Sequence, residues 1–190
     1  MYKKYFFIIL ILFFGIALNY SLNNKPSSEP QKQVVQASPA VIQNSTASGV
    51  LGQQTKTAGC VAQNGLPDAS CTPGAIFTQV TKQDVCTKGY TKTVRNVPLA
   101  IKNKVYEEYG IYSHVTGEYE VDHFISLELG GSNDISNLWP EPAQPKPGFH
   151  EKDMVENYLN SKVCQGVISL QEAQKEISTD WLEVYNQIPK

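Results

Sequence analysis

The chain has 190 residues, 41% of them hydrophobic and 18% charged, and a formal net charge of −2. This length fits one domain of ordinary size with additional segments, and the composition excludes a collagen-like or wholly disordered chain. A negative net charge argues against the basic surface that nonspecific nucleic-acid-binding proteins usually present. The charge is unevenly spread, since residues 151–190 hold seven acidic side chains against four lysines, so a basic face elsewhere is compatible with it.

The N-terminus has the pattern of an export signal. Lys3 and Lys4 precede an unbroken apolar run over residues 6–18, which is the order of regions in a signal peptide. The run is shorter than the ~20 residues of a typical transmembrane helix, yet the residues that follow it make a poor cleavage site. We therefore expect residues 1–22 to be a signal peptide or, alternatively, an uncleaved membrane anchor. In both cases the remainder is exported to the periplasm or the extracellular space.

Residues 23–58 have the composition of a flexible linker. They are rich in Ser, Gln, Asn, Pro, Thr and Ala and contain no aromatic residue. Such a segment buries too little apolar surface to offset the entropy lost on ordering. The predicted domain therefore covers residues 59–190.

The chain has four cysteines, Cys60, Cys71, Cys86 and Cys164, and no C-x-x-C pair among them. This spacing argues against a structural zinc site. An even number of cysteines behind an export signal indicates two disulfides formed in an oxidising compartment. Four cysteines allow three pairings, and the spacing alone does not choose among them.

A basic segment lies at residues 88–104, which carry four Lys and one Arg and no acid. Alternating Tyr and Thr predict an extended first half, and the stretch from Pro98 to Gly110 predicts a helix with its proline at the first position and its glycine at the C-cap. The segment is either a solvated face or a contact for phosphates. Arg95 and Lys92 are the candidate nucleic-acid contacts.

Residues 119–142 predict a strand, a loop and a second strand. Residues 119–125 alternate apolar and polar positions and include β-branched and aromatic residues, as a strand does. Glycines and an Asn-Asp pair at residues 130–134 are turn formers, residues 137–139 predict a second short strand closed by prolines, and a helix is expected to begin at His150. This order of elements can bring four side chains to one point: Asp122, His123, Asn137 and His150.

These residue types are the parts of a metal-assisted hydrolase. A carboxylate and an imidazole from different elements can hold one divalent cation, with water and phosphate in the open positions. A second imidazole can remove a proton from water, because histidine titrates near neutral pH, and an asparagine can fix its ring by a hydrogen bond. Together they suit hydrolysis of a phosphodiester.

The stretch also resembles the HNH, or ββα-metal, nuclease family. The motif consists of Asp122-His123, a Gly-Gly pair, Asn137-Leu138 and His150. The wider run Leu127-Glu-Leu-Gly-Gly…Asn137-Leu-Trp-Pro-Glu-Pro resembles small exported HNH-like proteins, and the likeness extends from about Cys71 to the C-terminus. It implies an α+β fold with a ββα-metal (HNH-like) centre and flanking helices.

The resemblance also implies roles for the four residues. His123 would be the general base, Asp122 and His150 the metal ligands, and Asn137 the residue that orients His123 and ties the loop together. The family further favours the disulfides Cys60–Cys71 and Cys86–Cys164, because cysteines resembling the second pair recur there together.

The chain departs from the family pattern at one position. Some members carry a second helix ligand one turn after the first, but Met154 stands there, and a thioether is a poor ligand for a hard cation. Two protein ligands and several waters suit Mg²⁺ or Mn²⁺, and Zn²⁺ or Ni²⁺ can also occupy such a site. Asp153 is a weaker candidate for a third ligand.

Two helices are predicted at the C-terminal end. The first covers residues 151–162, with Met154, Val155, Tyr158 and Leu159 facing inward. The second follows the capping-box pattern Ser169-x-x-Glu172 and runs to about residue 185.

We therefore expect an exported, disulfide-bonded, monomeric enzyme that uses a divalent metal to hydrolyse DNA, with RNA as an alternative substrate, at low sequence specificity. The alternative is a catalytically degenerate HNH-fold protein that acts as a surface binding module. A third interpretation is a structural protein of the cell envelope, in which the Asp/His cluster is incidental. Contact with a membrane is expected only through a possible N-terminal anchor.

Overall fold

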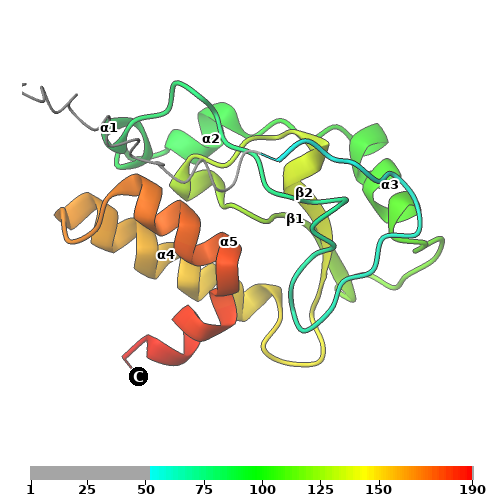
Figure 1. Ribbon diagram of the computed structural model, residues 1–190. Coiled ribbons are helices and arrows are strands. Elements are labelled where there is room, and N and C mark those ends of the chain that lie inside the picture. Colours follow the sequence, from blue (N-terminus) through cyan, green and yellow to red (C-terminus); the bar gives the residue numbers. More distant parts are fainter. Residues whose placement is uncertain (1–51, 190) are drawn as a thin grey trace, which may run out of the picture. The chain divides into compact units, whose positions relative to one another are not determined.

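The computed structural model describes residues 52–189. The predicted signal or anchor over residues 1–22 and most of the predicted linker lie outside this range. The described residues form an α+β arrangement of five α-helices, two short 3-10 helices and one two-stranded sheet (Figure 1). Within this part of the chain, no helix combines the length and the apolar character that a membrane crossing requires.

The two strands are antiparallel neighbours. β1 (Tyr119–His123) pairs with β2 (Leu138–Pro142), and Asp122 lies opposite Trp139. Both predicted strands are present, but β2 continues through Pro140 to residue 142. A proline lacks the N–H that a central strand needs, and it is tolerated here because both strands of a two-stranded sheet are edge strands. The connecting loop contains the 3-10 helices η1 (Leu127–Leu129) and η2 (Ile135–Asn137).

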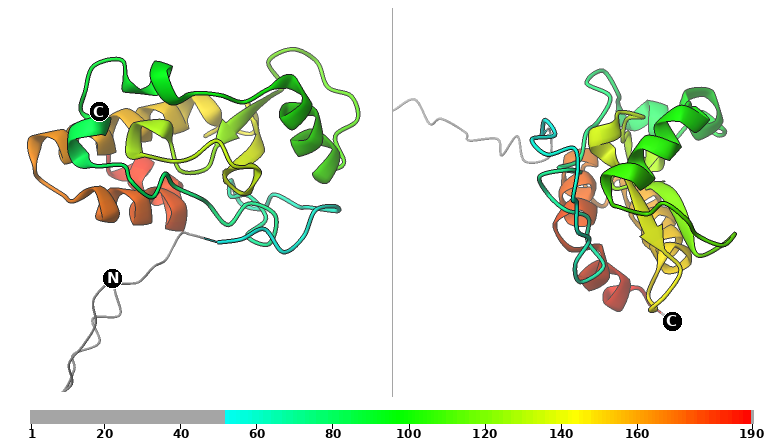
Figure 2. Two further views of the ribbon diagram at one scale, coloured as in Figure 1. Left: turned by 90° about the horizontal axis from the view of Figure 1, so that it is seen from above. Right: turned by 90° about the vertical axis from the view of Figure 1, so that its right-hand side faces the viewer.

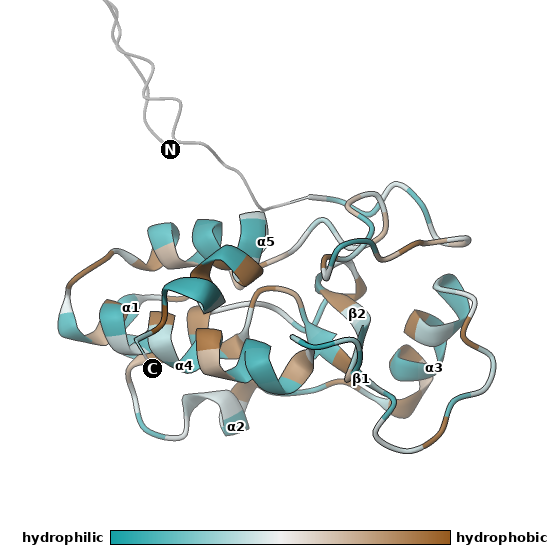
Figure 3. Cartoon of the chain, turned by 90° about the horizontal axis from the view of Figure 1, so that it is seen from below, coloured by the Kyte–Doolittle hydropathy of each residue, from teal (hydrophilic) through white to brown (hydrophobic). Residues whose placement is uncertain are grey.

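The helices lie on two sides of the strands. α4 (Phe149–Gln165) and α5 (Leu170–Gln187) run side by side on one side, and α3 (Leu99–Glu108) lies on the other (Figures 1 and 2). The turns of α5 that face outward are hydrophilic (Figure 3). The larger core joins α4, α5 and the loop between the strands. Its fully buried side chains are Ile125, Leu129, Val155, Leu159, Val163, Ala173, Ile177 and Trp181. A smaller cluster of Val105, Val121 and Leu138 lies under α3.

Two predictions about local structure are wrong. The segment expected to be extended contains the short helix α2 (Tyr90–Val94), which follows α1 (Lys82–Val85). Gly89, at φ 86°, makes the left-handed turn that starts it. Met154 was expected to face inward but is 50% exposed. The buried positions of α4 are 149, 152, 155, 159 and 163, so the helical period leaves Met154 on the outer side and turns a lysine inward.

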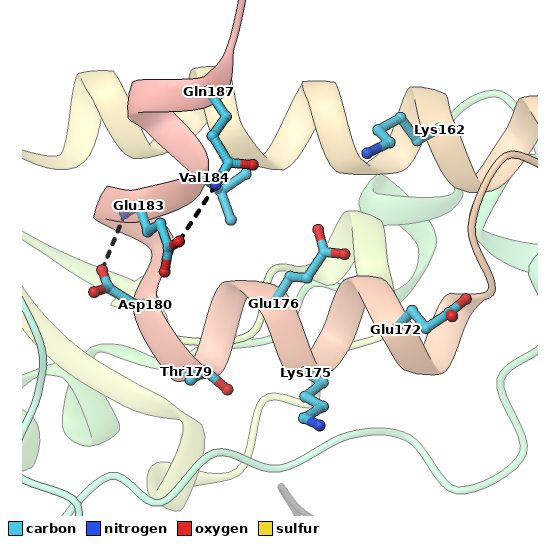
Figure 4. A pocket seen from close by; sticks show the side chains of 9 residues that line it. All are labelled: Lys162, Glu172, Lys175, Glu176, Thr179, Asp180, Glu183, Val184 and Gln187. Atoms are coloured by element: carbon cyan, nitrogen blue, oxygen red, sulfur yellow. Dashed lines mark hydrogen bonds between the residues drawn. The ribbon is translucent and has the colours of Figure 1, made fainter.

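The last helix begins as predicted and contains a break that was not predicted. Ser169 and Glu172 form the capping box, with the Ser169 hydroxyl accepting from the Glu172 N–H at 3.1 Å. At Asp180 the backbone leaves helical geometry, with φ −162° and ψ 86°. Its carboxylate accepts the N–H of Glu183 at 3.1 Å and so caps the following turns (Figure 4).

Asp68 organises the loop between the first two cysteines. Its carboxylate accepts the N–H groups of Ser70 at 2.9 Å and Val61 at 3.1 Å, and it pairs with the Lys56 ammonium at 2.9 Å. The Lys56 hydrogen bond and the backbone hydrogen bonds lower the pKa of Asp68 from 3.8 to about 2. Residues 52–58 of the predicted linker therefore lie against the folded domain, where Thr55 N also donates to Ser70 O at 2.8 Å.

The depressed pKa of Asp68 gives folding stability a defined pH dependence. A carboxylate with a lowered folded-state pKa contributes stability above its unfolded pKa and loses it as pH falls through the folded value. We expect Asp68→Asn to lower stability at pH 6, with the difference from the unchanged protein shrinking between about pH 4 and pH 2. Urea unfolding at several pH values measures this, and a difference that is constant down to pH 2 would contradict it.

Both expected disulfides are present. Cys60–Cys71 spans 11 residues, and Cys86–Cys164 spans 78 residues and joins the end of α1 to α4. The two bonds close loops of very different length. In the chain-entropy model, a longer closed loop restricts the unfolded chain more.

This difference gives a paired prediction. Replacing both members of Cys86–Cys164 by Ala should lower the free energy of unfolding by about 4 kcal/mol, and replacing Cys60–Cys71 by about 3 kcal/mol. Urea midpoints of the two double variants, measured side by side, test the order. A larger loss for the short loop would show that local packing, not loop entropy, governs the contribution of these bonds.

Candidate functional site

The site is built where β1 ends. Successive residues of a strand point to opposite faces, so Asp122 faces Lys152 of α4 while His123 points to the other face and meets Asn133 of the loop between the strands. Asp122 shares its face with Glu120 and, across the register, with Trp139 and Glu141. The side chains of Asp122 and His123 therefore serve different neighbours, although the two residues are adjacent in the chain.

His123 is held in one orientation and one tautomer. Its side chain is buried, and its Nε2 lies 3.2 Å from Asn133 Oδ1. Asn133 is itself fixed, since its Nδ2 donates to Val94 O at 2.7 Å and its Oδ1 accepts from Asn96 N at 3.1 Å. An oxygen can only accept, so Nε2 carries the ring proton. Nδ1 is then the basic atom, and it has no hydrogen-bond partner among the described residues.

The environment keeps this imidazole neutral. Burial lowers the pKa of His123 to about 4, and the Asp122 carboxylate and the Asn133 hydrogen bond only partly oppose this. A neutral ring with an unprotonated Nδ1 can accept a proton from water.

Asn137 performs one of the two tasks expected of it, because it ties the loop together but does not bind His123. The prediction that it orients His123 by a hydrogen bond is wrong, because Asn133 makes that bond. The fully buried Asn137 side chain binds main chain instead: its Nδ2 donates to Ile125 O at 3.0 Å and to Ser132 O at 2.9 Å, and its Oδ1 accepts from Ile125 N at 2.9 Å. It ties the two ends of the loop together, and only a side-chain amide has both the donors and the acceptor to do so.

A buried lysine stands behind Asp122. Lys152, fully buried in α4, donates from Nζ to Asp122 Oδ2 at 2.6 Å, to Glu156 Oε1 at 2.5 Å and to the carbonyl oxygen of His123 at 2.9 Å. Glu141 lies at 3.9 Å and is also buried. All three protons of the ammonium are thus used, and α4 is bound to the end of β1.

Lys152, Asp122, Glu156 and Glu141 form one cluster, the Lys152 cluster. Its three carboxyl groups differ in how strongly their surroundings favour the charged form. Burial disfavours the charge of Asp122, but the Lys152 ammonium outweighs it and the pKa of Asp122 is lowered. Burial raises the pKa of Glu156 to about 7 and that of Glu141 well above its ordinary value. Lys152 therefore favours the charged form of Asp122, while burial disfavours the charged form of Glu141.

Of the expected metal ligands, Asp122 belongs to this cluster and His150 lies outside it, at the start of α4. His150 is exposed in the first turn of α4, and its ring centroid is 4.4 Å from that of Phe149. Asp153 lies within electrostatic reach of both Asp122 and His150. Burial and Asp122 raise its pKa, and His150 lowers it. Residues 52–189 contain no group of three or more His, Cys, Asp or Glu side chains in metal-binding geometry. The Asp122 carboxylate and the His150 imidazole are only two donors, and such a pair suits a cation that keeps most of its water ligands.

Of the two expected nucleic-acid contacts, Arg95 lies beside the site. It is exposed at the end of α2, and its positive charge affects the pKa values of His123, Glu120 and Asp153. Lys92 is exposed on α2, three residues earlier. A phosphate held by Arg95 would therefore lie near the His123 ring.

Sequence reasoning missed two residues, Asn133 and Lys152. Asn133 was assigned to a turn, which is correct, but a turn residue gives no sign of what its side chain contacts. Lys152 and Glu156 have the i, i+4 spacing of an ordinary surface ion pair. Positions 152, 155 and 159 lie on the same inward side of the helix, although only the last two are apolar. This shared side is the signal that Lys152 is buried.

Comparisons with models of protein families, with curated proteins and with solved structures find no match for this chain. The HNH relationship is therefore a resemblance in the motif over residues 119–150. Assignment of a function depends on the groups of the site.

Two lysines form ion pairs at the same distance but differ in burial, so comparing them isolates the effect of burial on stability. Lys152→Met leaves Asp122 and Glu156 buried without their cation, which should lower the free energy of unfolding by about 3–5 kcal/mol. Lys146 pairs with Glu151 at the same 2.6 Å, but its side chain is 61% exposed, so Lys146→Met should change stability little. Thermal and urea unfolding of both variants provide the measurement. Equal effects would mean that the Lys152 cluster does not stabilise the fold.

Proposed function

We propose that the protein is a metal-dependent endonuclease of the HNH type that hydrolyses phosphodiester bonds with low sequence specificity. The observation that supports this best is the state of His123. It combines a fixed ring, a neutral imidazole and a buried, unpaired Nδ1 with the nearby charges of Asp122 and Arg95, which both affect its pKa. A residue held in this way is a general base more readily than a core histidine, whose two nitrogens would both be paired.

Nδ1 of His123 is itself buried in this structure. In the proposed reaction, a water molecule that reaches this atom gives it a proton as the water oxygen attacks phosphorus. The phosphorus–oxygen bond on the opposite side breaks, and the leaving oxygen is protonated from solvent. Asn133 keeps Nδ1 aimed by holding Nε2. Arg95 binds the phosphate through charge-assisted hydrogen bonds.

Asp122 and His150 would hold the divalent cation, Mg²⁺ or Mn²⁺ by preference, with Asp153 beside them. When bound, the cation neutralises charge that builds on the phosphate. Lys152 contributes by fixing Asp122 Oδ2, and the Asp122 side chain stays partly exposed.

One observation favours the alternative of a degenerate binding module. Lys152 already neutralises the charge of Asp122, which lowers the attraction of this carboxylate for a cation. A protein that had lost its metal would keep the fold through the same ion pair.

Cleavage of supercoiled plasmid distinguishes the two. We expect the purified protein, with disulfides formed, to nick plasmid in Mg²⁺ or Mn²⁺ and to stop when EDTA is added. His123→Ala should slow cleavage by about 10²- to 10⁴-fold, the usual contribution of a general base.

Lys175→Ala, on the exposed side of α5, is the control and should cleave at the unchanged rate. Absence of cleavage with any divalent metal would favour the binding module. Cleavage that persists in His123→Ala would place the reaction elsewhere.

A further inference from the structure

The segment that follows α3 presents aromatic side chains to solvent. Tyr112 is 83% exposed and Val115 71% exposed, although both are large apolar residues. A hollow of about 340 Å³ lies between this segment and the end of α3. Its lining residues are Asn103, Tyr106, Glu107, Ile111, Tyr112 and His114.

Rings form one wall of the hollow. The rings of Tyr106 and His114 lie 4.4 Å apart at 34°, and Tyr119 meets His114 edge-on at 6.2 Å. His114 Nδ1 donates to Val115 O at 3.3 Å, since a carbonyl can only accept, so Nε2 is left as an acceptor. The hollow thus offers flat aromatic surface together with a hydrogen-bond acceptor and the Asn103 amide.

The hollow lies along the strand that carries the proposed active site. Tyr119 opens β1 and His123 closes it, a span of about 13 Å at the rise of a strand. Lys102 and Lys104 are exposed on α3. Arg95 is exposed at the end of α2.

We propose that this hollow binds an unpaired base of single-stranded nucleic acid, stacked between Tyr112 and the Tyr106–His114 pair. Every base has a π-face, so stacking tolerates any sequence. Arg95, Lys102 and Lys104 contact the phosphates of the strand that leads to His123. This inference rests on the proposed function, whose preferred substrate it defines as single-stranded DNA or RNA.

The geometry also excludes a base that is still paired. A base in a duplex is stacked on both sides, and it must leave the helix to enter a pocket, at a cost of a few kcal/mol. The hollow therefore selects single strands, loops and ends over intact duplex.

Binding is tested apart from cleavage. The probes are three labelled 12-nucleotide oligonucleotides: single-stranded oligo-dT, single-stranded oligo-U and a DNA duplex. Their binding to the full chain carrying His123→Ala is measured by fluorescence anisotropy. EDTA and the His123→Ala change both keep the strands from being cut. We expect tighter binding to both single strands than to duplex. Tyr112→Ala in this background should weaken single-strand binding by about 5- to 150-fold, the range for one lost base–aromatic stack. Tyr112→Phe keeps the ring and should restore it.

The matched control is Val167→Ala, which shortens another exposed apolar side chain, 63% exposed in the turn between α4 and α5. It should leave binding unchanged. Equal affinity for duplex and single strand, or full affinity in Tyr112→Ala, would overturn the inference even if plasmid is cleaved. Single-strand binding that depends on Tyr112 in a protein that cleaves nothing would support the pocket and remove the nuclease function.

Discussion

The buried ammonium of Lys152 is the interaction on which the site depends. It joins α4 to the end of β1 through Asp122, the carbonyl of His123 and Glu156. A lysine can be this deeply buried only if each of its protons has an acceptor and its charge has a counter-ion, because transfer of an unpaired charge out of water is too costly. The geometry of Asp122 is therefore fixed by the packing of a helix 30 residues later in the chain.

The second constraint is the loop between the strands. Two asparagines divide the work: Asn137 pins the main chain of the loop, and Asn133 projects from it to hold the His123 ring. Gly131 is required at the same place, because a Cβ there would come within 1.7 Å of the Ile125 carbonyl oxygen. A loop packed this closely presents His123 with little freedom, which is what a general base needs.

These constraints give the two sides of β1 different surroundings. The Lys152 cluster lies on the α4 side of β1 and is largely buried. His123 points to the other face of the strand, where Tyr119 adjoins the aromatic hollow beside α3. In the proposed reaction, substrate would therefore lie along the α3 side of β1 and reach Asp122 at the end of β1 and His150 at the start of α4.

The sequence by itself determined the local elements of this protein. Alternation defined β1, capping residues defined the start of α5, and the resemblance to a family proposed both disulfides. Each of these depends on a short-range pattern or a motif. The tertiary structure alone decided which asparagine holds His123 and which residue neutralises Asp122. Those contacts depend on the rotation of a loop and a helix relative to one strand, and a sequence records the residues but not that rotation.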